Sequence, residues 1–295
     1  MKKSLGYNIL LVLTWPMQLF PLEFHYVVSD LLFGVLYYLI GYRKATVRIN
    51  LRKSFPSKSS LELKQLERKF YHHFVDLFIE TLYLVHINQK RNTKRLNFEN
   101  VELINQLYAK GKNIICVTGH YGNWEFLRIH SVPLQHKLYA IYKKLNNPLF
   151  DRFFKDVREQ DGAHLLEMRQ TYKQLVLDTE NGIPYFALFI ADQRPIKQEI
   201  KFWMPFLNQD TPVLTGPEKM AKKTNSAVVW AEMKRLKRGY YKIVFKLITE
   251  TPADEPEFEI TRLFMSELEQ AIQRCPEVWL WTHKRWKHQR EISKI

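Results

Sequence analysis

Residues 113–126 read Asn113-Ile-Ile-Cys-Val-Thr-Gly-His120-Tyr-Gly-Asn-Trp-Glu125-Phe126, and the fold class can be argued outward from them. The first half is a short apolar run rich in β-branched residues, a pattern typical of a buried strand. The second half predicts a turn that enters a helix over residues 123–128, with Asn123 as the N-cap. His120 is therefore expected at the carboxyl end of a strand, where open α/β sheets bind their ligands.

Glu125 follows His120 by five positions. On a continuous helix their side chains would point roughly 140° apart, because each residue advances about 100°. They can meet only if His120 lies in the loop and Glu125 in the first helical turn. A carboxylate on the histidine Nδ1 would then leave Nε2 outward as a general base. A half-buried histidine and a glutamate that interacts only with the helix dipole remain the structural alternative.

The composition points to an anionic partner. The 295 residues carry a formal net charge of +15, which suits nucleic acid, an anionic lipid surface, a phosphorylated substrate or an acidic carrier protein. The length allows one large domain or two small ones. Two distant cysteines form no CxxC pair, so neither a disulfide framework nor a zinc site is predicted, and a reducing compartment is expected.

Two apolar blocks lie near the N-terminus, at residues 7–20 and 26–42. Trp, Met and Phe stand where a signal peptide would need small residues. Neither block offers the roughly 20 unbroken apolar residues of a membrane span. The first could reach the bilayer as a short or tilted span and the second could lie along its interface; a pair of buried core helices is the alternative. The cations after Tyr42 predict that the rest of the chain stays in the cytoplasm.

The remaining chain alternates helices and strands, which favours an α/β fold. The adjacent His72 and His73 would point about 100° apart on their helix, so they make a poor metal pair. The expected helices cover residues 61–82, 101–111, 147–161, 169–181, 215–221 and 260–274, and the expected strands 137–142, 163–168, 183–192, 201–206, 226–234 and 240–249.

The motifs of several enzyme classes are missing from the sequence. It contains no GxSxG, GxxxxGK[ST] or GxGxxG pattern, which argues against a serine hydrolase, a kinase and a dinucleotide-binding enzyme. The tail, residues 279–290, mixes tryptophans with cations. This composition fits either stacking on nucleic acid bases or an anchor at a membrane interface.

Residues 119–125, Gly-His-Tyr-Gly-Asn-Trp-Glu, resemble the His-x4-Asp/Glu motif of the bacterial lipid A biosynthesis acyltransferases, which belong with the glycerolphosphate acyltransferase-like fold. One departure is Lys143-Lys144, where many members have Arg-Pro after the tyrosine. Further similarity covers nearly the whole chain, at Gly41–Arg43, Asn50–Arg52 through Pro56, Tyr142 through Arg152, Ala191–Gln193, Thr215–Pro217 and Trp279–Trp286.

The resemblance implies a mixed, mostly parallel sheet flanked by helices, with membrane-attachment helices over residues 1–55 and the catalytic domain over 56–295. It further implies transfer of a fatty acyl group from acyl carrier protein or CoA to a hydroxyl of a lipid A precursor. The enzyme would work at an anionic surface, on the cytoplasmic face of the inner membrane. No metal or redox cofactor and no nucleic acid partner are expected. The alternatives are another lipid acceptor, such as an aminolipid or another glycolipid, and a non-catalytic basic membrane- or nucleic-acid-binding protein.

The resemblance also assigns roles to individual residues. His120 would be the general base, and Glu125 would stabilise its imidazolium. Lys143, with backbone N–H groups near Asn123, would hold the oxyanion; lysine keeps the charge of arginine but loses its bidentate geometry. Trp124, Phe126 and the region of Trp203 would form the acyl groove, and Asp192, Gln193 and Arg194 would either line the same crevice or cap the following turn.

Overall fold

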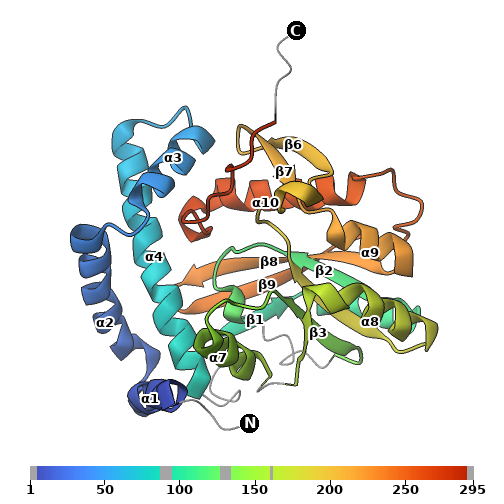
Figure 1. The fold of residues 1–295 in the computed structure, drawn as a ribbon, viewed down its shortest axis with the longest axis horizontal. Helices are drawn as coiled ribbons and strands as arrows, with labels where there is room; N and C mark the ends of the chain where they lie inside the picture. The colour runs from blue at the N-terminus through green and yellow to red at the C-terminus, as the bar shows by residue number, and fades with distance from the viewer. Residues whose placement is uncertain (1–4, 87–94, 127–133, 160–161, 291–295) are drawn as a thin grey trace.

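A mostly parallel sheet forms the centre of the molecule (Figure 1). The computed structural model describes residues 5–86, 95–126, 134–159 and 162–290. Within them, seven strands pair in the order β1-β9-β8-β2-β5-β3-β4. Neighbouring strands of this sheet are parallel, except that β8 and β9 are antiparallel to each other. The predicted fold class is therefore confirmed. The strands are β1 Leu96–Glu99, β2 Ile114–Thr118, β3 Lys137–Tyr142, β4 His164–Glu167, β5 Tyr185–Ile190, β8 Ala227–Lys237 and β9 Tyr240–Thr249.

Helices pack on both faces of this sheet. The central strand β2 is buried along its whole length and alternates between two hydrophobic clusters, because successive side chains of a strand point to opposite faces. Ile115 and Val117 belong to the cluster that contains residues of α8, α9 and α10, whereas Ile114 and Cys116 belong to the cluster that contains residues of α6. The helices in this part are α6 Val101–Ala109, α7 Pro148–Glu159, α8 Met168–Glu180, α9 Gly216–Thr224 and α10 Glu259–Arg274.

The N-terminal segment forms a helical layer beside the sheet (Figure 1). It contains α1 Leu5–Thr14, the 3₁₀ turn η1 Trp15–Leu19, α2 Leu22–Gly34, the π-helical turn η2 Val35–Ile40, α3 Lys44–Ser54 and α4 Ser60–His86. Pro21 separates the two apolar blocks because its ring favours an extended backbone. The long helix α4 lies between α2 and the sheet (Figure 1), and Leu22 and Tyr26 pack on Ile79 and Tyr83.

The outward face of α2 and η2 is apolar. Val27, Leu31, Val35 and Leu39 recur every fourth residue and are 60%, 69%, 42% and 79% exposed. Among the described helices, the continuous segment Leu22–Ile40 alone is long and apolar enough to cross a membrane, and 28% of its most apolar stretch of 18 residues is buried. Both observations are consistent with membrane association, because an ordinary core helix would turn this stripe inward.

Two local predictions differ from the structure. The helix expected over residues 123–128 is a short 3₁₀ turn, η3 Trp124–Phe126, and residues 127 and 128 lie outside the described part. Strand β7 Gln209–Val213, which pairs with β6 Phe202–Phe206, was not predicted. Its sequence, QDTPV, contains proline and little alternation, so no strand pattern marks it.

Candidate active site

The candidate site lies where β2 and β5 end. These strands are parallel neighbours, and Thr118 pairs in register with Ile190. The chain continues the pairing one step further, since the N–H of Ala191 donates to the carbonyl of Thr118 at 2.9 Å. His120 and Asp192 each follow two residues after a strand end, so the register brings them side by side.

His120 and Asp192 form a direct pair. The Nδ1 of His120 lies 2.6 Å from Oδ1 of Asp192, and the indole N–H of Trp279 donates to Oδ2 at 2.8 Å. Burial on its own raises the pKa of the Asp192 carboxyl, but the charge of His120 and hydrogen bonds from His120 and Trp279 outweigh burial and hold that pKa below its usual value. An ionised aspartate on Nδ1 keeps the ring proton there and leaves Nε2 as the acceptor. The His120 side chain is 20% exposed, so the ring is accessible.

Glu125 is not the partner of the His120 Nδ1, and this part of the prediction was wrong. The 3₁₀ turn directs its carboxylate towards α7, where Arg158 binds it with Nη2–Oε1 and Nε–Oε2 distances of 2.6 and 3.1 Å. Oε1 also accepts the indole N–H of Trp124 at 3.1 Å. The Trp124 ring in turn meets the His120 ring edge-on, with 4.9 Å between centroids. Glu125 therefore reaches the histidine through Trp124.

The turn between His120 and Glu125 is fixed by buried contacts with β8 and α4. Gly122 has φ +65°, and a Cβ there would come within 2.8 Å of Met233 Cγ, so both backbone and space require glycine. Asn123 is fully buried; its Nδ2 donates to Glu80 Oε2 at 2.7 Å and its Oδ1 accepts the N–H of Glu125 at 3.1 Å. The Asn123 side chain thus has its polar atoms bound within the protein and fixes the turn, in place of the predicted substrate contact.

An apolar cavity of about 710 Å³ begins beside this turn. The part of its lining nearest His120, here called the polar end, consists of Trp124, Glu125, Gln193 and His283. The other lining residues come mainly from α2–η2, α4 and α7. His120 borders the polar end, because its ring contacts Trp124 and its carbonyl accepts the N–H of Leu280, another lining residue, at 3.0 Å. The walls come from the apolar residues Leu32, Val35, Leu36, Ile40, Phe74, Val75, Leu77, Phe78, Leu82, Phe150, Phe153 and Phe154.

The other residues predicted to form the groove or to bind substrate do not line the cavity. Phe126 packs in the core against Tyr241, and Trp203 lies in β6 beneath Arg290, so neither lines the cavity as expected. Lys143 is exposed just beyond β3, on the same edge of the sheet as His120. Arg194 donates to the carbonyl of Lys284 at 3.1 Å and so links the β5 end to the C-terminal segment.

The C-terminal segment, residues 279–286, was not predicted to belong to the site. Trp279, Trp281 and Arg285 are at most 2% exposed, which contradicts both the base-stacking and the interfacial-anchor interpretations of these residues. Gly122 donates its N–H to the carbonyl of Val278 at 3.0 Å, so the segment pairs with the turn that carries His120. Alternating aromatic and basic residues suit a surface as well as a core, and the pattern alone does not distinguish them.

Within this segment, His283 is half-buried. Burial is the main reason that its pKa falls to about 4; Asp192 opposes the shift, and Arg194, Arg285 and His120 add to it. The Nδ1 atom of His283 is buried without a hydrogen-bond partner among the described residues. The imidazole is therefore neutral at pH 7.

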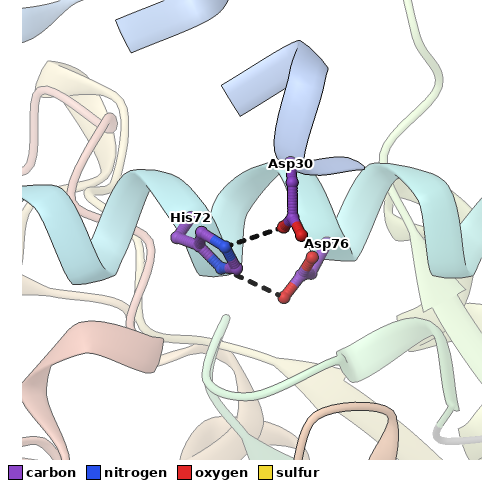
Figure 2. A group of neighbouring side chains, drawn as sticks. All are labelled: Asp30, His72 and Asp76. Carbon is purple, nitrogen blue, oxygen red and sulfur yellow. Dashed lines mark ion pairs between the residues drawn. The ribbon is translucent and has the colours of Figure 1, made fainter. Parts of the chain in front are cut away.

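A second polar cluster is formed by Asp30 on α2 with His72 and Asp76 on α4 (Figure 2). His72 on α4 has Nε2 2.9 Å from Asp30 Oδ1, and its Nδ1 is 3.6 Å from Asp76 Oδ2. The three side chains have the spacing of metal ligands. However, one guanidinium nitrogen of Arg238 lies 2.6 Å from both carboxylates, so a cationic side chain already neutralises them. His73 is buried while His72 is half-exposed, and the two rings diverge as expected for adjacent helical residues.

The fold and site combine a mostly parallel α/β sheet, a histidine–aspartate pair at adjoining strand ends and an apolar cavity beside an apolar outer helix, an arrangement that suits an enzyme with an apolar ligand. The family model for bacterial lipid A biosynthesis acyltransferases matches residues 3–288, and the chain belongs to this family. A lipid A biosynthesis acyltransferase of Haemophilus influenzae (strain ATCC 51907 / DSM 11121 / KW20 / Rd) is 22% identical over 265 residues, which cover 86% of this chain and 80% of that protein. Family membership supports an acyltransferase of lipid A synthesis.

Proposed function

We propose that the protein is a membrane-associated O-acyltransferase that moves a fatty acyl group from an acyl thioester to a hydroxyl of a lipid A precursor. The observation that carries this proposal is the His120–Asp192 pair beside the polar end of a 710 Å³ apolar cavity. The cavity is large enough for a long acyl chain and falls in the usual range for ligand pockets. His120 is the general base, and Asp192 keeps the ring proton of His120 on Nδ1 so that Nε2 can accept a proton.

The reaction follows from this geometry. His120 Nε2 takes the proton of the acceptor hydroxyl as the oxygen attacks the thioester carbonyl carbon. The carbonyl electrons move onto oxygen, and a tetrahedral oxyanion forms. When these electrons return, the carbon–sulfur bond breaks, and the imidazolium gives its proton to the departing thiolate. The products are an ester and a free thiol. Asp192 favours the step because it stabilises the imidazolium, and general-base assistance of this kind contributes about 10²–10⁴-fold.

Glu125 acts in this scheme as a positioning residue. Its carboxylate is bound by Arg158 and by the Trp124 indole N–H, and Trp124 packs edge-on against the general base. These contacts connect α7 to His120 through Glu125 and Trp124. They would fix the orientation of the His120 ring and complete the cavity wall. Glu125 therefore positions His120 indirectly, through Trp124.

The apolar stripe on α2 and η2 supports a location at a membrane. The cavity reaches residues of the same segment, Leu32 and Val35, so an acyl chain could pass between bilayer and site. We place the protein at the inner membrane, on its cytoplasmic face, because the cations after Tyr42 favour that side. A net charge of +15 suits an anionic membrane surface and an acidic acyl carrier protein as donor, although CoA is the alternative donor. Lys143 and Arg194, near the edge of the site, would contact the anionic donor or acceptor.

An aminolipid or another glycolipid would use the same base and cavity. The alternative of a non-catalytic nucleic acid binder has less support, since the tryptophans that would stack on bases are buried. No metal or redox cofactor takes part in the proposed reaction.

The test measures transfer of a radiolabelled fatty acyl group from acyl carrier protein and, separately, from CoA. The full-length protein in mixed micelles is given a hydroxyl-bearing lipid A precursor, an aminolipid or a neutral glycolipid. We expect ester formation on the lipid A precursor and its loss in His120→Ala, with His164→Ala, an exposed histidine on β4, as the matched control. Undiminished transfer by His120→Ala would refute the mechanism. Transfer to another acceptor only would change the substrate, and tight, salt-sensitive nucleic acid binding without any acyl transfer would favour the binder.

A further inference from the structure

Two histidines with opposite surroundings lie near the polar end of the cavity. His120 has an ionised aspartate on its Nδ1. His283 lines the cavity itself and has no hydrogen-bonding carboxylate among the described residues. Two histidines of one site that have such different hydrogen-bond partners can perform different steps of acid–base chemistry.

The surroundings of His283 keep it uncharged. Its ring is largely buried, and the cations Arg194 and Arg285 act on it together with His120. Arg285 is 1% exposed and donates to the carbonyl of Pro212 at 2.7 Å, so its charge is fixed in place near the ring. A second proton on His283 would add a charge to an already positive, poorly solvated region. The ring is thus neutral throughout the physiological range of pH.

The position of the ring proton follows from the buried nitrogen. Nδ1 is buried without a partner in the described part of the chain, and an unpaired buried N–H costs more than an unpaired lone pair. The neutral ring therefore carries its proton on Nε2, the nitrogen that is not enclosed. Because His283 lines the cavity, this N–H is the donor available to a bound ligand.

The backbone around His283 is fixed before any substrate binds. Asn50 on α3 donates from Nδ2 to the carbonyl oxygens of Trp281 and His283 at 2.9 and 3.0 Å. Arg43 donates to the carbonyl of Thr282 at 3.1 Å. A donor held in this way needs little reorganisation during a reaction, which is the condition for strong electrostatic stabilisation of a transition state.

We propose that His283 is a catalytic residue that donates its Nε2–H to the carbonyl oxygen of the acyl thioester and holds the oxyanion as it forms. The inference rests on the proposed acyl transfer and assigns one of its missing donors. His120 removes the hydroxyl proton and later returns it to the departing sulfur, while the His283 proton stays on nitrogen throughout. The negative charge that appears on oxygen when the C–O bond forms is thus met by a neutral donor, and it disappears when the C–S bond breaks.

The first test compares three variants at His283 with the His164→Ala control. His283→Ala should lower kcat by about 10²–10³-fold, the usual effect of losing one oxyanion donor, with KM changed by less than about threefold. In His283→Gln the amide N–H lies near the position of Nε2 and should recover at least about tenfold over alanine. His283→Asn places its amide nearer Nδ1 and should recover less. A kcat within about threefold of wild type in His283→Ala would overturn the proposal, as would equal recovery by asparagine and glutamine.

Two measurements need no turnover. ¹⁵N shifts of His283 in the full-length protein should show the neutral Nε2–H tautomer at pH 7; a charged ring or an Nδ1–H tautomer would refute the assignment. A fatty-acyl trifluoromethyl ketone thioether of pantetheine, which hydrates to a tetrahedral centre, should bind wild type tighter than the corresponding plain thioether. His283→Ala should lose that preference by a factor similar to its loss of kcat.

The outcomes separate the two claims. Wild-type turnover that persists in His283→Ala, with the ketone preference intact, would overturn the role of His283 and leave the proposed function standing. If the wild-type protein neither transfers an acyl group nor binds the ketone, the proposed function fails and the role of His283 fails with it. Ketone binding that depends on His283, without transfer to the lipid A precursor, would support the donor and require another acceptor.

Discussion

Asp192→Asn is the sharpest test of how His120 is activated. Asparagine keeps the shape of the side chain and a hydrogen bond from Trp279, but it removes the charge 2.6 Å from Nδ1. A pair of charges about 4 Å apart interacts by about 4 kcal/mol at an effective dielectric constant near 20. Because the imidazolium exists only while the hydroxyl proton is in transit, this energy is lost mainly from the transition state. We therefore expect kcat to fall about 10³-fold.

The assay is steady-state acyl transfer at saturating donor, with binding of the ketone analogue as a check that the cavity is intact. Glu125→Gln is the matched comparison, because the residue is a carboxylate of the same motif, held by Arg158 and away from Nδ1. Asp192→Asn should lower kcat with a nearly unchanged KM, whereas Glu125→Gln should also weaken donor binding, since it loosens Trp124 in the cavity wall. A kcat for Asp192→Asn within about threefold of wild type would refute the assignment of Asp192 as the partner of the base.

Three further predictions concern membrane contact, stability and pH. Leu31→Glu with Leu39→Glu should release the protein from anionic vesicles in a flotation assay without lowering its melting temperature, because both side chains are exposed. Arg238→Ala leaves the buried Asp76 without its closest cation and should cost about 3 kcal/mol, lowering the melting temperature by about 5 °C in calorimetry. Burial lowers the pKa of His73 in the folded protein to about 3, so the unfolded chain takes up this proton at a higher pH than the folded protein does. The free energy of unfolding should therefore fall as the pH drops from about 6.5 towards 3. His73→Gln should reduce the slope of the unfolding free energy against pH by about 1.4 kcal/mol per pH unit.

Much of the fold follows from local patterns. The apolar run Ile114–Thr118 and the glycines beside it identify the central strand, and the predicted strand at residues 137–142 matches β3. The first is buried along its whole length and the second is half-buried, and both carry the apolar pattern of a strand in their own sequence. By contrast, β1 Leu96–Glu99 is a short edge strand whose pattern is too weak to predict.

The site could be predicted only in part, because its central contact depends on strand order. Sequence spacing suggested Glu125 as the partner of His120, whereas the parallel pairing of β2 with β5 selects Asp192, 72 residues away. The sequence did contain a usable signal, since Asp192 also follows a buried strand and carboxyl ends of parallel strands share one edge. The role of Trp279 had no such signal, because a tryptophan in a basic tail is equally suited to an interface.

Helix α4 holds the exposed apolar helix α2 and the turn that carries His120 in a fixed position relative to each other. Glu80 is fully buried and accepts hydrogen bonds from Tyr26 on α2, Asn123 in the turn and Tyr241 on β9. One helical turn away, Asp76 is bound by Ser29 and Arg238. Apolar contacts between α2 and α4 would tolerate sliding, but directional bonds to buried carboxylates do not, since each misplacement leaves an unpaired acceptor. The cavity between these helices therefore has a fixed depth relative to His120, and that depth, set by α2, α4 and α7, is where selection of acyl length should be sought.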